Sequence, residues 1–165
     1  MIITLIGMMG VGKSTVGKNL SRELNWPFYD IDKIICRKTG ESIPDIFSRG
    51  GNLTFRNWER KVIAQVFTDI SKGIVAPGGG AVLDRQNRKL FRRGGPIFYL
   101  AADIEEILER IEFSNRPLLN KENKPENKIR ELLCSRKRLY EMGHKIDTTD
   151  LTIDETICLI KENLK

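Results

Sequence analysis

The first residues with an evident chemical use form a glycine-rich loop near the N-terminus. Residues 7–14 read Gly-Met-Met-Gly-Val-Gly-Lys-Ser, which fits the pattern Gly-x-x-x-x-Gly-Lys-Ser/Thr of loops whose backbone N–H groups surround nucleotide phosphates. Glycine is needed because the chain must turn tightly and approach the phosphates without an intervening Cβ. Lys13 would reach the β- and γ-phosphates, and Ser14 would place its hydroxyl on Mg²⁺. The loop therefore predicts a nucleotide-binding site.

Two aspartates follow a second apolar stretch, where they could take part in phosphoryl transfer. Asp30 and Asp32 flank Ile31, so in an extended strand they would project to the same face. One carboxylate could then support Mg²⁺ while the other accepts a hydroxyl proton. The alternative is that both acids cap a helix that begins near Lys33. We expect the first arrangement, at the carboxyl end of a strand.

Two arginines belong to helical stripes that are mainly apolar. A helix predicted from about Leu53 to Ile70 contains Arg56, and one predicted from about Glu126 to Met142 contains Arg136. A charge on a buried stripe needs a partner. One interpretation is that both form structural ion pairs, Arg56 with Glu59. The other is that two guanidinium groups form a pocket for a carboxylate or a phosphate, each with paired hydrogen bonds.

Three consecutive glycines, Gly78, Gly79 and Gly80, follow Pro77 and a short apolar run. Glycine permits backbone conformations and close contacts that a side chain would forbid. A flexible turn is the alternative explanation. Because parallel sheets bind ligands at the carboxyl ends of their strands, we expect these glycines to lie against a substrate.

The elements that must position these residues alternate between strand and helix. Apolar runs predict strands, the first of them central, and helical patterns fall between them. The predicted strands are residues 2–6, 28–32, 74–76, 97–100 and 145–146. This order predicts an α/β protein with three α/β/α layers and a five-stranded parallel sheet. Residues 120–127 include no apolar residue to bury, which predicts a mobile surface segment.

Composition limits the class of protein. A chain of 165 residues suits one domain. It contains no run of roughly 18 apolar residues that could form a membrane helix, and no export signal, so we expect a cytoplasmic protein without a membrane partner. Cys36, Cys134 and Cys158 are widely spaced, which favours reduced thiols over a disulfide framework or a zinc site. Catalysis should therefore depend on carboxylates, lysine and arginine.

The net charge of +6 raises the question of a nucleic-acid partner, and basic residues cluster between Arg85 and Arg93. No RNA-binding aromatic motif or zinc-finger spacing accompanies them, and small anionic ligands explain a modest positive charge equally well. We expect no nucleic-acid partner. A monomer is the default, because no heptad pattern or long apolar edge indicates a dimer.

Other nucleotide-binding classes fit the sequence less well. A GTP-dependent switch needs Asn-Lys-x-Asp, whereas residues 120–123 read Asn-Lys-Glu-Asn. A motor ATPase usually has an apolar strand that ends in an acidic residue. The closest match to that pattern in this sequence is the apolar run at residues 97–100, followed by Asp103. Asp103 and Glu106 are instead typical of a capping pair at the start of a helix.

Taken together, the motifs resemble the shikimate kinase family over nearly the whole chain and in the family's order. The matching segments are residues 7–15 (nucleotide loop), Phe28-Tyr29-Asp30-Ile31-Asp32, Phe55-Arg56-x-x-Glu59, Gly78-Gly79-Gly80, the lid motif Asn115-Arg116-Pro117-Leu118-Leu119, and Arg136-Lys137-Arg138-Leu139-Tyr140. The resemblance implies a phosphate-loop NTPase fold similar to nucleoside monophosphate kinases. It implies one kinase domain over residues 1–165, with a substrate-binding segment at about 32–60 and a mobile lid at about 112–127.

The resemblance also implies an activity: MgATP-dependent phosphorylation of the 3-hydroxyl of shikimate, giving shikimate 3-phosphate and ADP, in aromatic amino-acid biosynthesis. The implied nucleotide-binding residues are Gly10, Val11, Gly12, Lys13, Ser14, Thr15 and Arg116. The implied shikimate-binding residues are Asp32, Arg56, Gly78, Gly79, Gly80 and Arg136. Lys13, Asp32 and Arg116 are the implied catalytic residues, and Ser14 and Asp30 the implied Mg²⁺ residues.

Two positions depart from the family pattern. Asn52 replaces a glutamate ahead of Phe-Arg, and Gly143 replaces an alanine that commonly follows the tyrosine motif. Asn52 could weaken the support of Arg56, and Gly143 could loosen the end of its helix near adenine. A related kinase of gluconate or a nucleoside monophosphate is the alternative within enzymes. A nucleic-acid-stimulated NTPase is the alternative from another class.

Overall fold

The computed structural model describes residues 1–111 and 125–164. The expected lid, about 112–127, therefore falls outside the described residues except for its last three, and Arg116 falls outside them altogether. Within the described ranges, no helix combines the length and apolar character that crossing a membrane requires.

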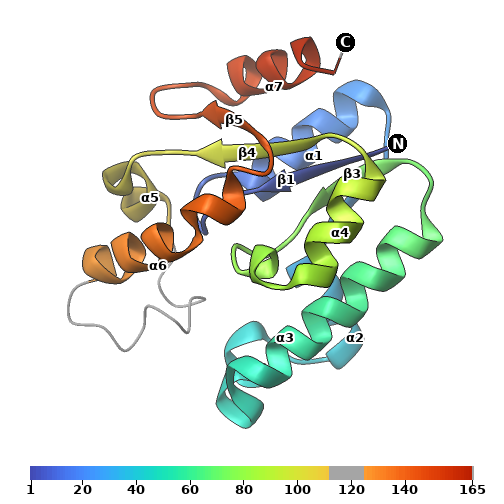
Figure 1. Cartoon of the computed structure of the whole chain (residues 1–165), viewed down its shortest axis with the longest axis vertical. Helices are drawn as coiled ribbons and strands as arrows, with labels where there is room; N and C mark the ends of the chain where they lie inside the picture. Colours follow the sequence, from blue (N-terminus) through green and yellow to red (C-terminus); the bar gives the residue numbers. More distant parts are fainter. Residues whose placement is uncertain (112–124, 165) are drawn as a thin grey trace.

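The described strands form one parallel sheet in the order β2-β3-β1-β4-β5 (Figure 1). Their bounds are β1 Ile2–Ile6, β2 Phe28–Asp30, β3 Gly73–Ala76, β4 Ile97–Ala101 and β5 His144–Asp147. The five-stranded parallel sheet is thus confirmed, with β1 at its centre. Thr4 of β1 is aligned with Val75 of β3 on one side and with Ile97 of β4 on the other.

Helices cover both faces of the sheet, so the central strand has no polar face. Ile3 and Leu5 point into a core that includes residues of α1 (Lys13–Leu24) and α7 (Ile153–Glu162). Ile2 and Ile6 point the other way, into a core shared with α3 (Ile43–Asp69), α4 (Arg85–Gly94) and α6 (Pro125–Tyr140). This alternation explains why β1 is buried throughout and apolar except for Thr4. The three-layer prediction is confirmed.

Two shorter helices and a 3₁₀ turn complete the described fold. Helix α2 covers Ile31–Thr39, α5 covers Ile104–Arg110, and η1 covers Ala81–Leu83 directly after the glycine triplet.

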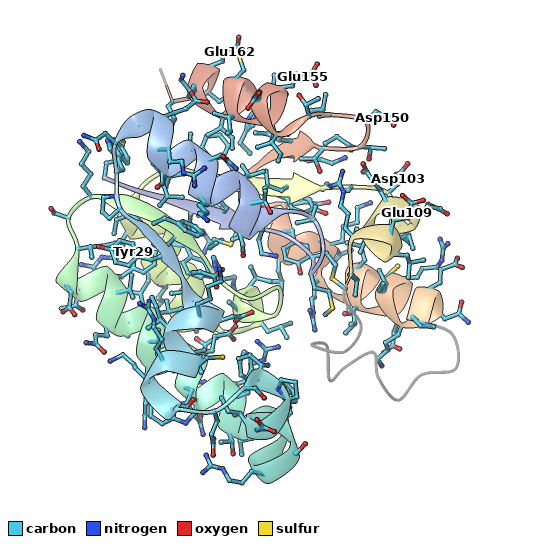
Figure 2. The ribbon with its side chains drawn as sticks, turned by 180° about the vertical axis from the view of Figure 1, so that it is seen from behind. Tyr29, Asp103, Glu109, Asp150, Glu155 and Glu162 are labelled. Carbon is cyan, nitrogen blue, oxygen red and sulfur yellow. The ribbon has the colours of Figure 1, made fainter. Side chains whose placement is uncertain are left out.

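Charge is distributed unevenly over the surface. Asp150, Glu155 and Glu162 project outward along α7 and the loop before it (Figure 2). The basic cluster lies on α4, where Arg85, Lys89, Arg92 and Arg93 are exposed.

Strand β2 is shorter than the sequence predicts. It ends at Asp30, and Ile31 and Asp32 form the first turn of α2. The Asp30 carboxylate accepts a hydrogen bond from the N–H of Lys33 (3.2 Å), and this capping contact favours the start of a helix over another strand residue. The prediction that the two aspartates alternate in an extended strand is therefore wrong.

Two further helix boundaries differ from the prediction, and a third helix has the predicted start without the predicted capping bond. Helix α3 begins at Ile43, after a capping box made by Ser42 and Asp45, and it is kinked at Gly51 (φ 66°). Residues 125–127 begin α6 rather than extending a mobile segment. Asp103 is the N-cap residue of α5 but makes no side-chain capping bond, and Glu106 pairs instead with Arg110.

Gly143 lies tightly against β4. A Cβ at this position would lie 2.8 Å from Cγ2 of Ile97 and 3.0 Å from its carbonyl oxygen. The glycine therefore allows the chain after α6 to enter β5 beside β4. The structure thus gives Gly143 a packing role that the sequence did not indicate, and a looser helix end near adenine stays a prediction.

Gly17 similarly allows α1 to approach β2. A Cβ on Gly17 would lie 2.4 Å from Cε2 of Phe28. The contact matters for the site because α1 contains Ser14 near its start and β2 ends at Asp30. The distance between those two side chains thus depends on a glycine in the middle of a helix.

We expect Gly17→Ala to destabilise the fold. Alanine favours a helix over glycine by about 1 kcal/mol, but overpacking against the Phe28 ring costs about 1–3 kcal/mol, so the clash should dominate. Urea unfolding measures the difference, with the exposed Lys18→Ala on the same helix as a control for helix propensity. A Gly17→Ala protein more stable than the wild type would contradict the packing argument.

Candidate active site

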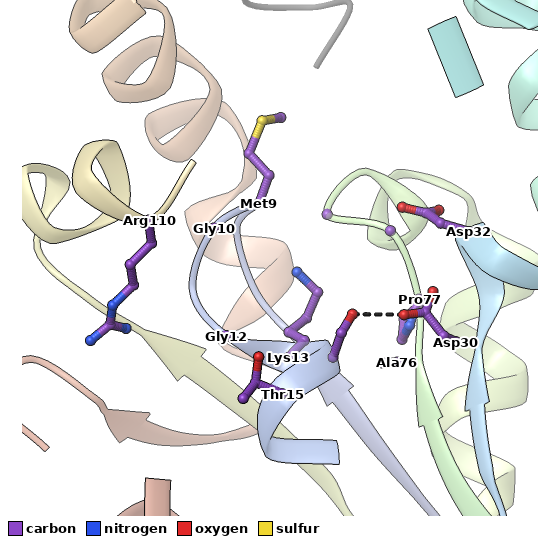
Figure 3. Close-up of a pocket in the computed structure, with 13 residues that line it drawn as sticks. Met9, Gly10, Gly12, Lys13, Thr15, Asp30, Asp32, Ala76, Pro77 and Arg110 are labelled. Atoms are coloured by element: carbon purple, nitrogen blue, oxygen red, sulfur yellow. Dashed lines mark hydrogen bonds between the residues drawn. The ribbon is translucent and has the colours of Figure 1, made fainter. Parts of the chain in front are cut away.

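The carboxyl ends of β1, β2 and β3 meet at a pocket of about 280 Å³ (Figure 3). The residues that line it are Met9, Gly10, Gly12, Lys13, Ser14, Thr15, Asp30, Asp32, Ala76, Pro77, Gly78, Gly79 and Arg110. The structure thus places the predicted nucleotide loop, both aspartates and two of the predicted glycines around one cavity. This is the edge at which parallel sheets bind ligands.

The glycine-rich loop has the backbone of an anion site. Gly10 (φ 80°) and Gly12 (φ 94°) adopt left-handed conformations, which an L side chain would strain. Gly12 is also the N-cap residue of α1, so no side chain occupies the end of the helix. The first N–H groups of α1 and the positive end of its dipole are therefore available to a phosphate. The Val11 side chain is buried in the core, so a nucleotide role for this residue would involve its backbone.

Lys13 lies inside this loop. Its ammonium donates hydrogen bonds to the carbonyl oxygens of Gly7 (2.9 Å) and Met8 (2.8 Å), and the residue is buried. Figure 3 shows the ammonium beside the loop, on the side that faces Asp30. The charge is held at the pocket wall, where it can attract the phosphates of a nucleotide.

Ser14 and Asp30 are joined by a hydrogen bond. The Ser14 hydroxyl donates to Oδ2 of Asp30 at 2.7 Å, drawn as a dashed line in Figure 3. The other carboxylate oxygen of Asp30 caps α2, so this residue both starts a helix and faces the pocket. Two adjacent side-chain oxygens suit Mg²⁺, which is usually held by few protein ligands together with substrate phosphates. The pair therefore fits the expected metal site.

Asp32 reaches the same pocket from the first turn of α2. It lies beside the glycine triplet, because a Cβ on Gly78 would lie 3.1 Å from its Oδ1 atom. The two aspartates therefore share the pocket although they are not in one extended strand.

Arg56 forms an ion pair with Glu59. Its Nη1 atom lies 2.5 Å from Oε2 of Glu59, whose side chain is only 1% exposed. Burial raises the pKa of Glu59 to about 7, against the opposing effect of the Arg56 and Arg136 charges. The ion-pair interpretation of Arg56 is thus confirmed. It does not exclude anion binding, because Nε of Arg56 is buried without a hydrogen-bond partner among the described residues.

Arg136 lies in the same buried neighbourhood. It is 4% exposed on α6, its charge acts on both Glu59 and Tyr140, and its Nη1 atom has no hydrogen-bond partner in the described part of the chain. A buried guanidinium nitrogen without a partner is costly. Two such donors from two helices can be satisfied by one anionic ligand.

The glycine triplet lies between these charges and the phosphate loop. A Cβ on Gly78 would lie 2.7 Å from Oε1 of Glu59, and one on Gly80 would lie 2.0 Å from Nη2 of Arg56. A Cβ on Gly79 would lie 3.1 Å from the backbone nitrogen of Met9. Each glycine of the triplet is therefore packed closely on the side where a Cβ would lie, while Gly78 and Gly79 also line the pocket. These glycines make room for the side chains of the site.

Sequence reasoning missed Arg110 and the hydroxyl of Tyr140. Arg110 lines the main pocket and a second one of about 390 Å³, which shares Gly12 and Thr15 with it. A basic residue in the last turn of a helix is ordinary, so nothing in the sequence marked Arg110. Tyr140 matched a motif, but its bond to the glycine triplet depends on the tertiary fold.

Comparisons with known proteins agree with this geometry. The family model for shikimate kinase matches residues 9–165. A shikimate kinase of Thermodesulfovibrio yellowstonii is 43% identical over 155 residues, which is 93% of this chain and 88% of that protein. One from Deinococcus radiodurans is 40% identical over 141 residues, covering 86% of this chain and 71% of that protein.

Solved structures give the same result. A shikimate kinase from Acinetobacter baumannii in complex with shikimate has a TM-score of 0.87 and 37% identity, covering 99% of this chain and 92% of that one. A deoxyadenosine kinase from M. mycoides, with a TM-score of 0.65 and 13% identity over 99% of both chains, shares the fold alone. A phosphate loop, a partly buried Arg56 and a buried Arg136, together with a match that spans most of the sequence, lead to one conclusion: this chain belongs to the shikimate kinase family.

Proposed function

We propose that this chain transfers the γ-phosphoryl group of ATP to the 3-hydroxyl of shikimate, giving shikimate 3-phosphate and ADP. The observation that supports this most is the convergence of Arg56 and Arg136 beside a pocket lined by the phosphate loop. Shikimate has a carboxylate for two guanidinium groups and a hydroxyl to receive the phosphoryl group. The reaction belongs to aromatic amino-acid biosynthesis and, because it consumes ATP, we place it in the cytoplasm.

The nucleotide would bind across both pockets. The triphosphate would lie in the main pocket against the loop N–H groups and Lys13, and the nucleoside would lie in the second pocket. Gly12, Thr15 and Arg110 line both, so one ligand can extend from one into the other. The second pocket includes Val16, Leu151 and Ile153, which suits the flat apolar faces of a base.

The acceptor would lie on the other side of the triplet. Arg56 and Arg136 would bind its carboxylate, and Gly78, Gly79 and Gly80 would contact its ring through the backbone. Asp32 would bind the reacting hydroxyl and accept its proton. Because phosphoryl transfer passes through a loose transition state, alignment of this hydroxyl should matter as much as basicity.

Ser14 and Asp30 would hold the Mg²⁺ ion, which when bound neutralises charge on the β- and γ-phosphates. Their hydrogen bond at 2.7 Å supports the assignment, because it brings two oxygen ligands together. Lys13 would act on the transferred group from its place in the phosphate loop. The roles of Arg116 and of a closing lid at about 112–127 stay predictions from the resemblance, as does a single domain with a substrate-binding segment at about 32–60. A monomeric state and the absence of a nucleic-acid partner stay predictions from the sequence pattern.

Coupled measurement of ADP release tests the acceptor. We expect turnover with shikimate, and only background rates with gluconate, with nucleoside monophosphates or with added RNA. Lys13→Ala, which removes the ammonium from the phosphate loop, should fold and show no turnover. Equal rates with gluconate and shikimate, or RNA-stimulated ATP hydrolysis, would contradict the proposal.

Arg136→Lys should weaken acceptor binding selectively. A lysine ammonium cannot reproduce two parallel hydrogen bonds to a carboxylate, so we expect KM for shikimate to rise about 10- to 100-fold and KM for MgATP to change little. Steady-state kinetics measures both. The matched control is Arg138→Lys, an exposed position on the same helix. Equal changes in the two KM values would count against a carboxylate contact.

Protonation of Glu59, which lies beside Arg56 and Arg136, makes the stability of the folded protein depend on pH. The pKa of Glu59 is about 7 in the folded protein, against 4.5 for the exposed group. Between these values the folded protein keeps a proton that the unfolded chain has released, so stability must fall as pH rises from 4.5 to 7 and become level above that range. The cause is burial of the carboxylate, which Arg56 and Arg136 compensate only in part.

We therefore expect Glu59→Gln to remove this contribution to the pH dependence. The wild type should lose stability relative to the variant between pH 5 and pH 7, with a slope of at most about 1.4 kcal/mol per pH unit. Urea unfolding at several pH values gives the two curves. Glu162→Gln, at an exposed position on α7, should follow the wild type. Parallel wild-type and Glu59→Gln curves would show that Glu59 is not a group with a raised pKa.

A further inference from the structure

Tyr140 is a fully buried residue at the end of α6. Its ring stacks on that of Tyr99 in β4, with centroids 5.1 Å apart and planes inclined by 18°. The ring thus fills the core between the sheet and α6. The hydroxyl has different neighbours, and these bring together three parts of the site.

The hydroxyl lies at a junction between the phosphate loop, the glycine triplet and the arginine pair. It donates a hydrogen bond to the carbonyl oxygen of Gly79 at 2.6 Å, and the sulfur of Met8 lies 3.9 Å away. A phenol hydroxyl has one proton to donate. The Gly79 carbonyl is the closer and stronger acceptor, so it receives the hydrogen bond. Arg136, one helical turn earlier, is close enough for its positive charge to act on the same hydroxyl and lower its pKa.

The hydroxyl remains a donor over the physiological range. Burial raises the pKa of Tyr140 to about 12, although the positive charges of Arg136 and Arg56 oppose this effect. Tyr140 therefore keeps its proton at neutral pH. The hydrogen bond to Gly79 does not depend on the protonation of neighbouring carboxylates.

The orientation of the Gly79 carbonyl affects how the glycine triplet lies relative to the phosphate loop and to Arg56. The α-carbon of Gly79 lies against the phosphate loop, since a Cβ there would lie 3.2 Å from the carbonyl oxygen of Gly7. In a planar trans peptide, the carbonyl of Gly79 and the N–H of Gly80 point in opposite directions. Holding the oxygen therefore also sets the direction of the Gly80 N–H, next to the Arg56 guanidinium.

We propose that the Tyr140 hydroxyl is a positioning group for the acceptor. By holding the Gly79 carbonyl, and so keeping the α-carbon of Gly79 against the phosphate loop, it sets the distance and angle between the bound carboxylate and the nucleotide. This inference rests on the proposed function. It assigns the tyrosine a role in acceptor alignment that is separate from the packing of its ring.

Tyr99 supplies a matched control for the test. It is the stacking partner of Tyr140, it is also buried, and its own hydroxyl is acted on by Asp147 and Glu141 rather than by groups of the site. Tyr140→Phe and Tyr99→Phe therefore remove the same atom from the two halves of one aromatic pair. Any difference in acceptor kinetics reports on the position of the hydroxyl rather than on the stack.

We expect Tyr140→Phe to lower kcat/KM for shikimate about tenfold, in the range that loss of one buried hydrogen bond produces. KM for MgATP should stay within about twofold. Tyr99→Phe should leave all these values within about twofold of the wild type. Unchanged shikimate kinetics in a folded Tyr140→Phe enzyme would overturn the inference. So would equal losses for shikimate and MgATP, which a merely structural role would give.

A wild-type enzyme without turnover on shikimate would instead refute the proposed function. In that case the contact between the Tyr140 hydroxyl and Gly79 can still be tested, because ¹⁵N-glycine labelling reports on it without any substrate. The Gly79 and Gly80 amide resonances should move in Tyr140→Phe and stay in place in Tyr99→Phe. If Tyr140→Phe does not fold, the wild-type protein should show a slowly exchanging Tyr140 hydroxyl proton with a nuclear Overhauser contact to Gly79. Unmoved amides, or the absence of that proton, would overturn the inference.

Discussion

The site depends on three consecutive residues that have no side chains. Gly78 lies against Glu59, Gly79 against the backbone of the phosphate loop, and Gly80 against the Arg56 guanidinium. Phosphoryl transfer requires the acceptor hydroxyl to approach the phosphate directly. Any side chain in the triplet would displace either a charged group or the loop. The glycines therefore set the separation between the two halves of the reaction.

The buried charges beside the triplet are costly for the fold. Glu59 is almost fully buried, its pKa is raised to about 7, and its ion pair with Arg56 compensates burial only in part. Arg56 and Arg136 each keep a buried nitrogen without a hydrogen-bond partner in the described ranges. Proteins commonly accept such local costs where a ligand will satisfy the groups. The same feature explains why stability and acceptor binding should both respond to changes in this cluster.

Much of the architecture could be predicted from the sequence because it is encoded locally. Each predicted strand is present, and β1 is central, because its apolar run suits a strand covered on both faces. The errors arose where local signals compete. Residues 28–32 have the alternation of a strand, but the Asp30 side chain caps a helix and ends the strand at that residue. The packing of Gly143 was missed for another reason, because its need for a small residue depends on contact with β4, which is far away in the sequence.

The sequence by itself determined the phosphate loop, since consecutive N–H groups and one lysine make an anion site without help from distant residues. It also indicated that Arg56 and Arg136 need partners, but not which ones. Only the tertiary structure decided that Arg56 pairs with Glu59, that both arginines lie around one carboxylate, and that Tyr140 holds Gly79. The physical reason is that charge pairing and close packing depend on distances in space. Residues far apart in the chain acquire those distances only when the helices pack on the sheet.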